Sequence, residues 1–152
     1  QNQLDSNSLV EKYNIFKRYP DSLDIKIEKT EFLARTNNNG KIYFIGSNGK
    51  LSKNNLSNVQ LPFIFGKPKI KEFLYFKKII DESKFSYNEI KNFYFFSSKR
   101  WDLELKNNII IKLSSSYPKD SLQLAFEFMY NNDLTDIKII DARVKNQIIL
   151  NG

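Results

Sequence analysis

Short stretches in which apolar and polar residues alternate recur along this chain. Residues 23–28 and 100–105 both alternate in this way, as half-buried β-strands do. Two longer stretches instead place apolar residues three and four positions apart, which indicates helices over 68–82 and 118–131. The pattern therefore predicts an α+β fold in which an antiparallel or mixed sheet is flanked by two helices.

The first part of the chain, residues 1–35, is predicted to form a helix–strand–strand unit. The stretch 4–14 begins with serines that can cap a short helix. A strand around Ile15, a turn and the strand at 23–28 follow. Such an α-β-β unit buries little apolar surface, so we expect it to be only part of a larger domain.

The remaining residues, 36–152, are predicted to contain further strands and turns together with the two helices. Asn- and Gly-rich turns at 36–40 and 46–50 flank a strand, and GSNGK at 46–50 lacks the spacing of a phosphate-binding loop. The segment LPFIFG, 61–66, is apolar without a helical or strand period, so a packed loop is expected there. Asn107 and Asn108 are predicted to form a two-residue hairpin loop with positive φ at both positions.

Residues 139–150 are predicted to form one terminal strand with period 2. The side expected to face the core carries Ile140, Ala142, Val144, Ile148 and Leu150. The opposite side carries Asp141, Arg143, Lys145 and Gln147. A structural strand, a piece of an active site and an edge for another chain are the three roles to consider.

Composition removes most enzymatic roles. The chain has no His and no Cys, which excludes thiol nucleophiles, imidazole acid–base chemistry and the usual zinc sites. The 17 acidic residues are spread along polar faces, and nothing pairs two of them in an apolar pocket. We therefore expect no enzyme and no catalytic, cofactor-binding or metal-binding residues, and the terminal strand loses its active-site role.

Charge and aromatic content bear on possible partners. The net charge of +7 comes from 20 Lys and only 4 Arg, scattered along the chain, which is typical of a solvated surface rather than of a nucleic-acid reader. The consecutive aromatic residues at 93–96 predict a strand that is buried on both faces or that meets a partner with one face. No run of about 18 or more apolar residues is present.

Five motifs occur in the order seen in one known family. They are RYPDSLDIKIEKTEFLA at 18–34, GKIYFIGSNGKLS at 40–52, LPFIFG at 61–66, RWDLELKNNIIIKL at 100–113 and IDARVKNQII at 140–149. Together they resemble the FtsQ/DivIB family of bacterial cell-division proteins. The motif positions that carry the resemblance are Arg18, Pro20, Glu28, Ala34, Gly49, Leu61, Pro62, Gly66, Arg100 to Asn108, Asp141 and Arg143. Val144 stands where members of the family often carry an aromatic residue.

The resemblance implies a non-enzymatic scaffold of the division machinery. It implies a single-pass inner-membrane protein at the division septum, anchored by a segment outside this sequence, with this part in the periplasm. Residues 1–35 would be the C-terminal part of a POTRA-like domain and 36–152 the β domain. An alternative with the same fold is a POTRA-containing protein of outer-membrane assembly or secretion that binds unfolded β-strands.

The expected mechanism is strand addition to the terminal strand by partners of the FtsB and FtsL type. Arg100 and Arg143 would select an acidic partner segment, although Asp141 and Arg143 could equally pair with each other. The residues expected to bind the partner are Arg100, Trp101, Asp141, Arg143, Val144, Lys145, Asn146, Gln147 and Ile148.

Overall fold

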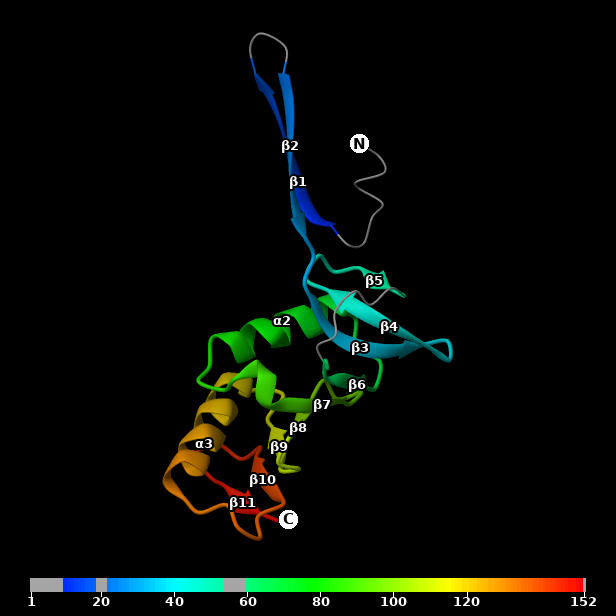
Figure 1. Ribbon diagram of the computed structural model, residues 1–152. Coiled ribbons are helices and arrows are strands. Elements are labelled where there is room, and N and C mark those ends of the chain that lie inside the picture. Colours follow the sequence, from blue (N-terminus) through cyan, green and yellow to red (C-terminus); the bar gives the residue numbers. More distant parts are fainter. Residues whose placement is uncertain (1–9, 19–21, 54–59, 152) are drawn as a thin grey trace. The chain divides into compact units, whose positions relative to one another are not determined.

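The chain divides into two compact units between Leu61 and Pro62 (Figure 1). The computed structural model describes the backbone of residues 10–18, 22–53 and 60–151, with side chains described from Thr30 onward. The architecture is α+β, as the sequence predicts: the described elements comprise two α-helices and eleven strands. Within these residues, no helix is both long and apolar enough to cross a membrane.

The first unit begins with a strand where the sequence predicted a helix. β1, Val10–Arg18, pairs antiparallel with β2, Ser22–Lys29. The prediction of a helix over 4–14 is therefore wrong for 10–14, and its earlier part lies outside the described residues. A serine cap is a local signal, whereas the β-branched and aromatic residues of this segment fit a ladder in which Ile15 pairs with Ile25. The predicted strand at 23–28 is confirmed by β2.

Three further strands form an antiparallel meander in the first unit. They are β3, Phe32–Asn38, β4, Lys41–Gly46, and β5, Leu51–Ser52. Asn39 and Gly40 make the predicted turn, with φ of 55° and 82°, and positive φ at both central residues matches the twist of the flanking strands. The segment GSNGK makes the turn from β4 to β5, so its expected role as a hairpin turn is confirmed.

The strands of the second unit follow the order β11-β10-β9-β8-β7-β6 in a mixed sheet. β6, Phe63–Phe65, runs parallel to β7, Ile90–Phe95, and α2, Ile70–Asp81, connects them. β9, Ile110–Leu113, runs parallel to β10, Ile139–Ala142, and α3, Pro118–Asn131, connects these. β8, Trp101–Leu105, and β11, Ile149–Leu150, pair antiparallel with their neighbours, and a 3₁₀ turn at Tyr87–Glu89 precedes β7.

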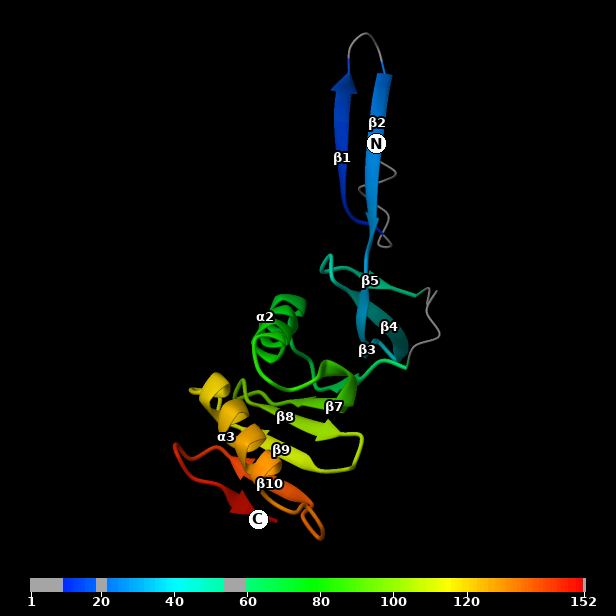
Figure 2. The ribbon, with the colours of Figure 1, turned by 60° about the vertical axis from the view of Figure 1, so that its left-hand side comes forward.

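Both predicted helices are confirmed, and they cover one face of this sheet (Figure 2). Pro118 occupies the first turn of α3, where a missing N–H costs nothing. Beneath the helices lies a row of cross-strand neighbours, each at most 1% exposed: Ile64, Phe93, Leu103, Ile111 and Ile140. From α2, Phe73 and Phe76 meet Phe93 edge-on with ring centroids 5.5 and 6.1 Å apart. This row is the core of the second unit.

β6 corrects the prediction of a loop at 61–66. Ile64 points into the core, whereas Phe63 and Phe65 point to the other face, so the strand does alternate. Because all three residues are apolar, the alternation is invisible in the sequence. Gly66 ends the strand with φ of 97°, and a Cβ there would lie 2.2 Å from the carbonyl oxygen of Phe95. The Gly of the LPFIFG motif is thus required by the close approach of β6 to β7.

The hairpin between β8 and β9 has a longer loop than predicted. The N–H of Asn108 donates to the Leu105 carbonyl at 2.8 Å, and the N–H of Leu105 donates to the Ile109 carbonyl at 2.9 Å. Asn108 has φ of 71°, whereas Asn107 does not have positive φ. The loop is therefore a type I turn followed by one left-handed residue, which is a three-residue connection, and the prediction of positive φ at both asparagines is wrong.

The predicted terminal strand at 139–150 is two strands in the structure. β10 and β11 pair with each other antiparallel, with Ile140 opposite Leu150 and Asp141 opposite Ile149. Residues 143–148 form the turn between them, closed by the Gln147 N–H on the Val144 carbonyl at 3.2 Å and by Asn146 with φ of 60°. Cross-strand neighbours share a face of the sheet. Residues of β10 and β11 in the hairpin therefore lie on the same faces as they would in the single strand that the sequence indicated.

The division of the sequence at residue 35 into a POTRA-like part and a β domain stays a prediction. Residue 35 lies inside β3, and the two compact units divide further along, between Leu61 and Pro62.

Candidate functional site

Three neighbouring strands of the second unit each place one charged residue in the same row. Asp102 on β8 lies opposite Lys112 on β9, and Lys112 lies opposite Asp141 on β10. Along each strand these charged residues alternate with the buried residues of the core. They therefore lie on the face of the sheet opposite the helices, the open face. This charged row contains two of the residues that the sequence motifs single out, Asp102 within RWDLEL and Asp141 within the Asp-x-Arg motif.

Each aspartate of the row is held by an arginine two residues away. Arg100 donates from Nε and Nη2 to the two oxygens of Asp102, at 3.0 and 3.1 Å. Arg143 donates in the same bidentate manner to Asp141, at 2.9 and 2.7 Å, and its backbone N–H adds a third bond at 3.0 Å. The pairing of Asp141 with Arg143, which the sequence left as one of two roles, is present in the structure.

The two arginines also differ in what else they contact. The guanidinium of Arg100 lies 4.3 Å from the ring centroid of Phe96, a cation–π contact that fixes it over the hairpin between β7 and β8. The side chain of Arg143 is 42% exposed while that of Asp141 is 6% exposed. Arg143 can therefore offer its outer N–H groups to a second acceptor without leaving Asp141.

The two aspartates have opposite pKa shifts. Burial raises the pKa of Asp102 above its ordinary value, and the hydrogen bonds from Arg100 only partly oppose this. The hydrogen bonds from Arg143 lower the pKa of Asp141, against a smaller effect of burial. Asp141 in turn raises the pKa of the Arg143 guanidinium. The Asp141–Arg143 pair is therefore firmly ionised, whereas Asp102 is the member of the row that protonates more readily.

Trp101 lies apart from this charged face. Its ring stacks on Phe76 of α2 with 4.8 Å between centroids and 5° between planes, and it is 7% exposed. Phe93 and Phe95 also contact it. The side chain predicted to touch a partner is thus part of the core, because the period-2 pattern of β8 that puts Asp102 on the open face puts Trp101 under the helix.

The turn at 143–148 carries the remaining residues of the predicted site. Val144 is 48% exposed, and the ammonium of Lys145 lies 5.3 Å from the ring centroid of Tyr117 at the start of α3. Asn146 occupies the left-handed position, which Asn tolerates better than most residues. None of these residues, nor Gln147 or Ile148, belongs to β10, so they do not form the continuous edge that the sequence predicted.

β11 lies at one edge of the sheet. No described strand lies beyond it in the sheet order. The N–H of Asn151 donates to the Ile139 carbonyl, at 2.8 Å, so this N–H points toward β10. Main-chain groups alternate in direction along a strand, so the N–H and C=O of Leu150 point outward. The side chains of β11 are also accessible, with Ile149 39% and Leu150 42% exposed on opposite faces.

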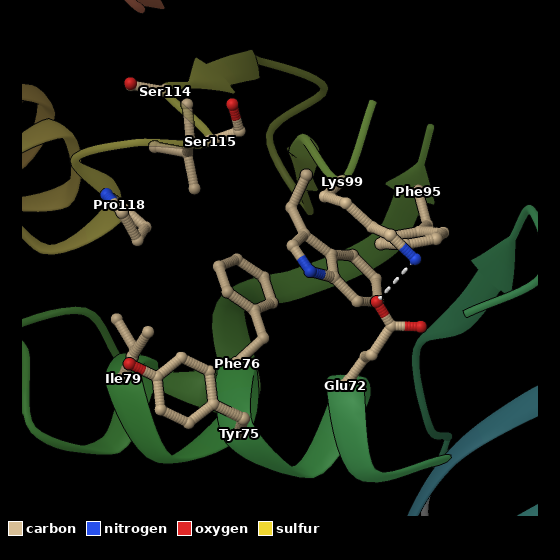
Figure 3. A pocket seen from close by; sticks show the side chains of 11 residues that line it. Glu72, Tyr75, Phe76, Ile79, Phe95, Lys99, Ser114, Ser115 and Pro118 are labelled. Carbon is tan, nitrogen blue, oxygen red and sulfur yellow. Dashed lines mark ion pairs between the residues drawn. The ribbon is translucent and has the colours of Figure 1, made fainter. Parts of the chain in front are cut away.

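A groove is lined by residues of α2, of the β7–β8 hairpin and of the segment before α3 (Figure 3). It has a volume of about 200 Å³ and a floor that includes Phe76, with Lys99 and Glu72 joined across its rim by an ion pair of 3.0 Å. Glu72 also accepts the backbone N–H of Lys69 at 2.9 Å, and this bond lowers its pKa. Both oxygens of the carboxylate are thus engaged, which leaves the groove without a free charge for chemistry.

Metal binding receives no support from the described residues, because no three or more Asp, Glu, His or Cys side chains there gather into a possible site. Glu104, on the open face of β8, accepts hydrogen bonds from Asn92 at 2.9 Å and Tyr94 at 2.8 Å. These bonds lower its pKa and keep it ionised, so it does not resemble a carboxyl poised for acid–base catalysis.

Sequence reasoning missed Leu150 and Asn151, the residues that form and fix the open edge. No local signal marks them, because residues 139–150 alternate in the same way for one long strand as for the hairpin of β10 and β11.

No protein-family model matches the chain, and no curated protein matches it. Among solved structures, it is similar to the major extracytoplasmic domain of the trans isomer of the cell-division protein DivIB from Geobacillus stearothermophilus. The match covers 70% of this chain and 99% of that one, with 11% identity and a TM-score of 0.47.

DivIB is a member of the FtsQ/DivIB family, which the motifs of this chain resemble. At 11% identity this likeness concerns the fold alone.

Proposed function

We propose that this chain is the extracytoplasmic part of a cell-division protein of the FtsQ/DivIB type, which binds its partners by strand addition and does not act as an enzyme. The partners are proteins of the FtsB and FtsL type, and the site of action is the periplasmic side of the inner membrane at the septum. The family assignment rests on the five ordered motifs. The binding mode rests on one observation, the open edge of β11.

The edge supplies backbone pairing that is independent of the partner's sequence. The outward N–H and C=O of Leu150 can each form one hydrogen bond with an added strand. The exposed side chains of Ile149 and Leu150 would contact the alternate residues of that strand on both faces of the sheet. An extended partner segment with apolar residues therefore fits this edge.

The charges beside the edge favour an acidic segment. The turn at 143–148 carries Arg143 and Lys145 and has no acidic residue. Arg143 keeps donor groups exposed while bound to Asp141, so an acidic partner side chain can join the pair without breaking it. Arg100 is the second candidate for this role, whereas the buried Trp101 contributes by supporting the sheet.

Proline at position 150 tests the edge directly. Pro lacks an N–H, and the Leu150 N–H points away from β10, so Leu150→Pro removes an outward donor while leaving the internal ladder intact. Loss of this bond and crowding by the ring should lower the affinity for the partner roughly tenfold or more. A tenfold change in Kd corresponds to about 1.4 kcal/mol. The measurement is calorimetric titration with the purified extracytoplasmic domains of the FtsB- and FtsL-type proteins of the same organism.

The matched control is Leu150→Ala, which keeps the N–H and shortens the side chain. It should weaken binding less than the proline variant does. A proline at Val144 would not test the edge, because Val144 lies in the turn. Unchanged affinity of Leu150→Pro, with an unchanged circular dichroism spectrum, would overturn strand addition at β11.

A further inference from the structure

The edge strand β11 is too short to hold itself in place. Only two of its residues pair with β10, and both of their side chains remain about two-fifths exposed. Two-residue pairing with little apolar burial contributes little stability, and isolated two-stranded ribbons are marginal in water even when they are longer. A further interaction is needed to keep β11 on the sheet.

Asn151, directly after β11, provides four hydrogen bonds at this point. Its Oδ1 accepts the N–H of Lys138 at 2.7 Å and the N–H of Ile139 at 3.0 Å. Its Nδ2 donates to the Asp136 carbonyl at 3.2 Å, and its own N–H donates to the Ile139 carbonyl at 2.8 Å. The side-chain amide thus behaves as an additional peptide group that lies against the start of β10.

The backbone around Asn151 suits this arrangement. Asn151 has φ of 53°, a left-handed conformation that Asn adopts more readily than most residues. On the opposite side, the carbonyl of Lys138 accepts the N–H of Ile110 from β9, at 2.9 Å. The start of β10 is therefore held by β9 on one side and by Asn151 on the other, and an incoming strand cannot reach it.

We propose that Asn151 is a positioning residue that pins β11 to β10, fixes its register and so presents the outward groups of Leu150 to a partner. The role of the pinned edge in partner binding rests on the proposed function. The pinning itself is a property of the folded chain and can be measured without a partner.

Hydrogen exchange of single amides tests the pinning. In the wild-type protein the N–H groups of Lys138 and Ile139 should be protected, because both are bound to Oδ1. Asn151→Ala removes this acceptor, so their exchange should accelerate roughly tenfold or more, the factor that corresponds to a hydrogen bond of about 1–1.5 kcal/mol. The Leu103 amide, in the middle of the sheet, should exchange at its wild-type rate and so report that the core is intact.

Asn151→Asp serves as the conservative variant. It keeps the two acceptor contacts, but a carboxylate oxygen replaces the donor to the Asp136 carbonyl, so Lys138 and Ile139 should be protected less than in the wild type and more than in Asn151→Ala. Titration with the FtsB- and FtsL-type domains is then compared across the wild type and both variants. Affinity should fall roughly tenfold for Asn151→Ala and less for Asn151→Asp.

The two measurements separate the possible failures. Unchanged protection of Lys138 and Ile139 in Asn151→Ala would overturn the pinning. Accelerated exchange with wild-type affinity would overturn the positioning role while leaving the proposed function standing. A wild-type protein that binds neither domain would overturn the proposed function, and the exchange data alone would then decide whether Asn151 holds β11.

Discussion

At the scale of single residues, the open face of the sheet is organised by two arginine–aspartate pairs around Lys112. The pairs have the same bidentate geometry, yet the pKa of Asp102 is raised and that of Asp141 is lowered. The difference follows from which effect is larger, burial for Asp102 and hydrogen bonding for Asp141. The contributions of these two aspartates to the free energy of unfolding therefore change with pH in opposite directions.

Unfolding at several pH values should show this opposition. Asp141 has a lowered pKa in the folded state, so its stabilising contribution is present above its unfolded pKa of about 3.9 and is lost as the pH falls through the lower folded value. The difference in free energy of unfolding between wild type and Asp141→Asn should therefore shrink as the pH is lowered from roughly 6 to roughly 3. Urea denaturation followed by circular dichroism measures it.

Asp102→Asn is the matched variant with the opposite sign. The raised pKa in the folded state means that the folded state binds the proton more tightly than the unfolded state does. As the pH falls, the free energy of unfolding of the wild type should therefore rise relative to that of Asp102→Asn. If both differences changed in the same direction with pH, the assignment of burial to one residue and hydrogen bonding to the other would be contradicted.

At the scale of elements, the packing of α2 on β7 and β8 explains why the most conspicuous residue of RWDLEL is structural. Trp101 is enclosed by Phe76, Phe93 and Phe95, and the ring of Phe73 lies 6.3 Å away. The aromatic run at 93–96 is divided by the same period, with Phe93 fully buried and Tyr94 on the open face bonded to Glu104. Trp101 and Phe93 are buried and therefore not available to a partner.

Trp101→Ala should therefore lower stability and leave binding intact. Removing a buried Trp typically costs about 3–5 kcal/mol through lost burial and the cavity left behind. The free energy of unfolding measured in urea should fall by an amount in that range, while partner affinity, measured under conditions in which the variant is folded, should match wild type.

Tyr75→Ala, on the exposed side of the same helix, is the control for this change. Tyr75 is 65% exposed, so its loss should alter stability by no more than about 0.5 kcal/mol. Weaker partner binding by folded Trp101→Ala would show that the residue also acts at the interface.

At the scale of the whole molecule, the charge balance bears on how partners are found. The chain carries a net charge of +7, and the turn beside the open edge contains only positive charges. An oppositely charged partner is attracted over distances comparable to the Debye length, which raises its rate of association. The scattered lysines, although they do not form a nucleic-acid site by sequence, can still act in this way.

Association with the FtsB- or FtsL-type domain should consequently slow with added salt. Raising the ionic strength from about 0.05 to about 0.5 M should reduce the association rate constant roughly tenfold while changing the dissociation rate much less. Stopped-flow or surface-based kinetics distinguish the two rate constants. An association rate independent of salt would argue against an acidic partner segment.

Local patterns were sufficient for the elements whose signals lie within a few residues. The 3.6-residue period located α2 and α3, Asn39-Gly40 located a hairpin turn, and alternation located β2 and β8. The LPFIFG motif located Gly66 without its reason, which is that a Cβ there would lie 2.2 Å from the Phe95 carbonyl oxygen. The helices, strands and turn are decided by the conformational preferences of neighbouring residues, whereas the need for Gly66 comes from a contact with a distant strand.

The tertiary structure alone decided which residues meet. The alternation of apolar and polar residues is the same for one long strand as for β10 folded back on β11. The sequence therefore could not show that Val144 lies in a turn and Leu150 on the edge. The period of β8 could place Trp101 and Asp102 on opposite faces, but only the position of α2 determined which face is covered. Pairing between distant strands depends on hydrogen bonds and burial that no local pattern records, and these contacts separate the core of this protein from its open edge.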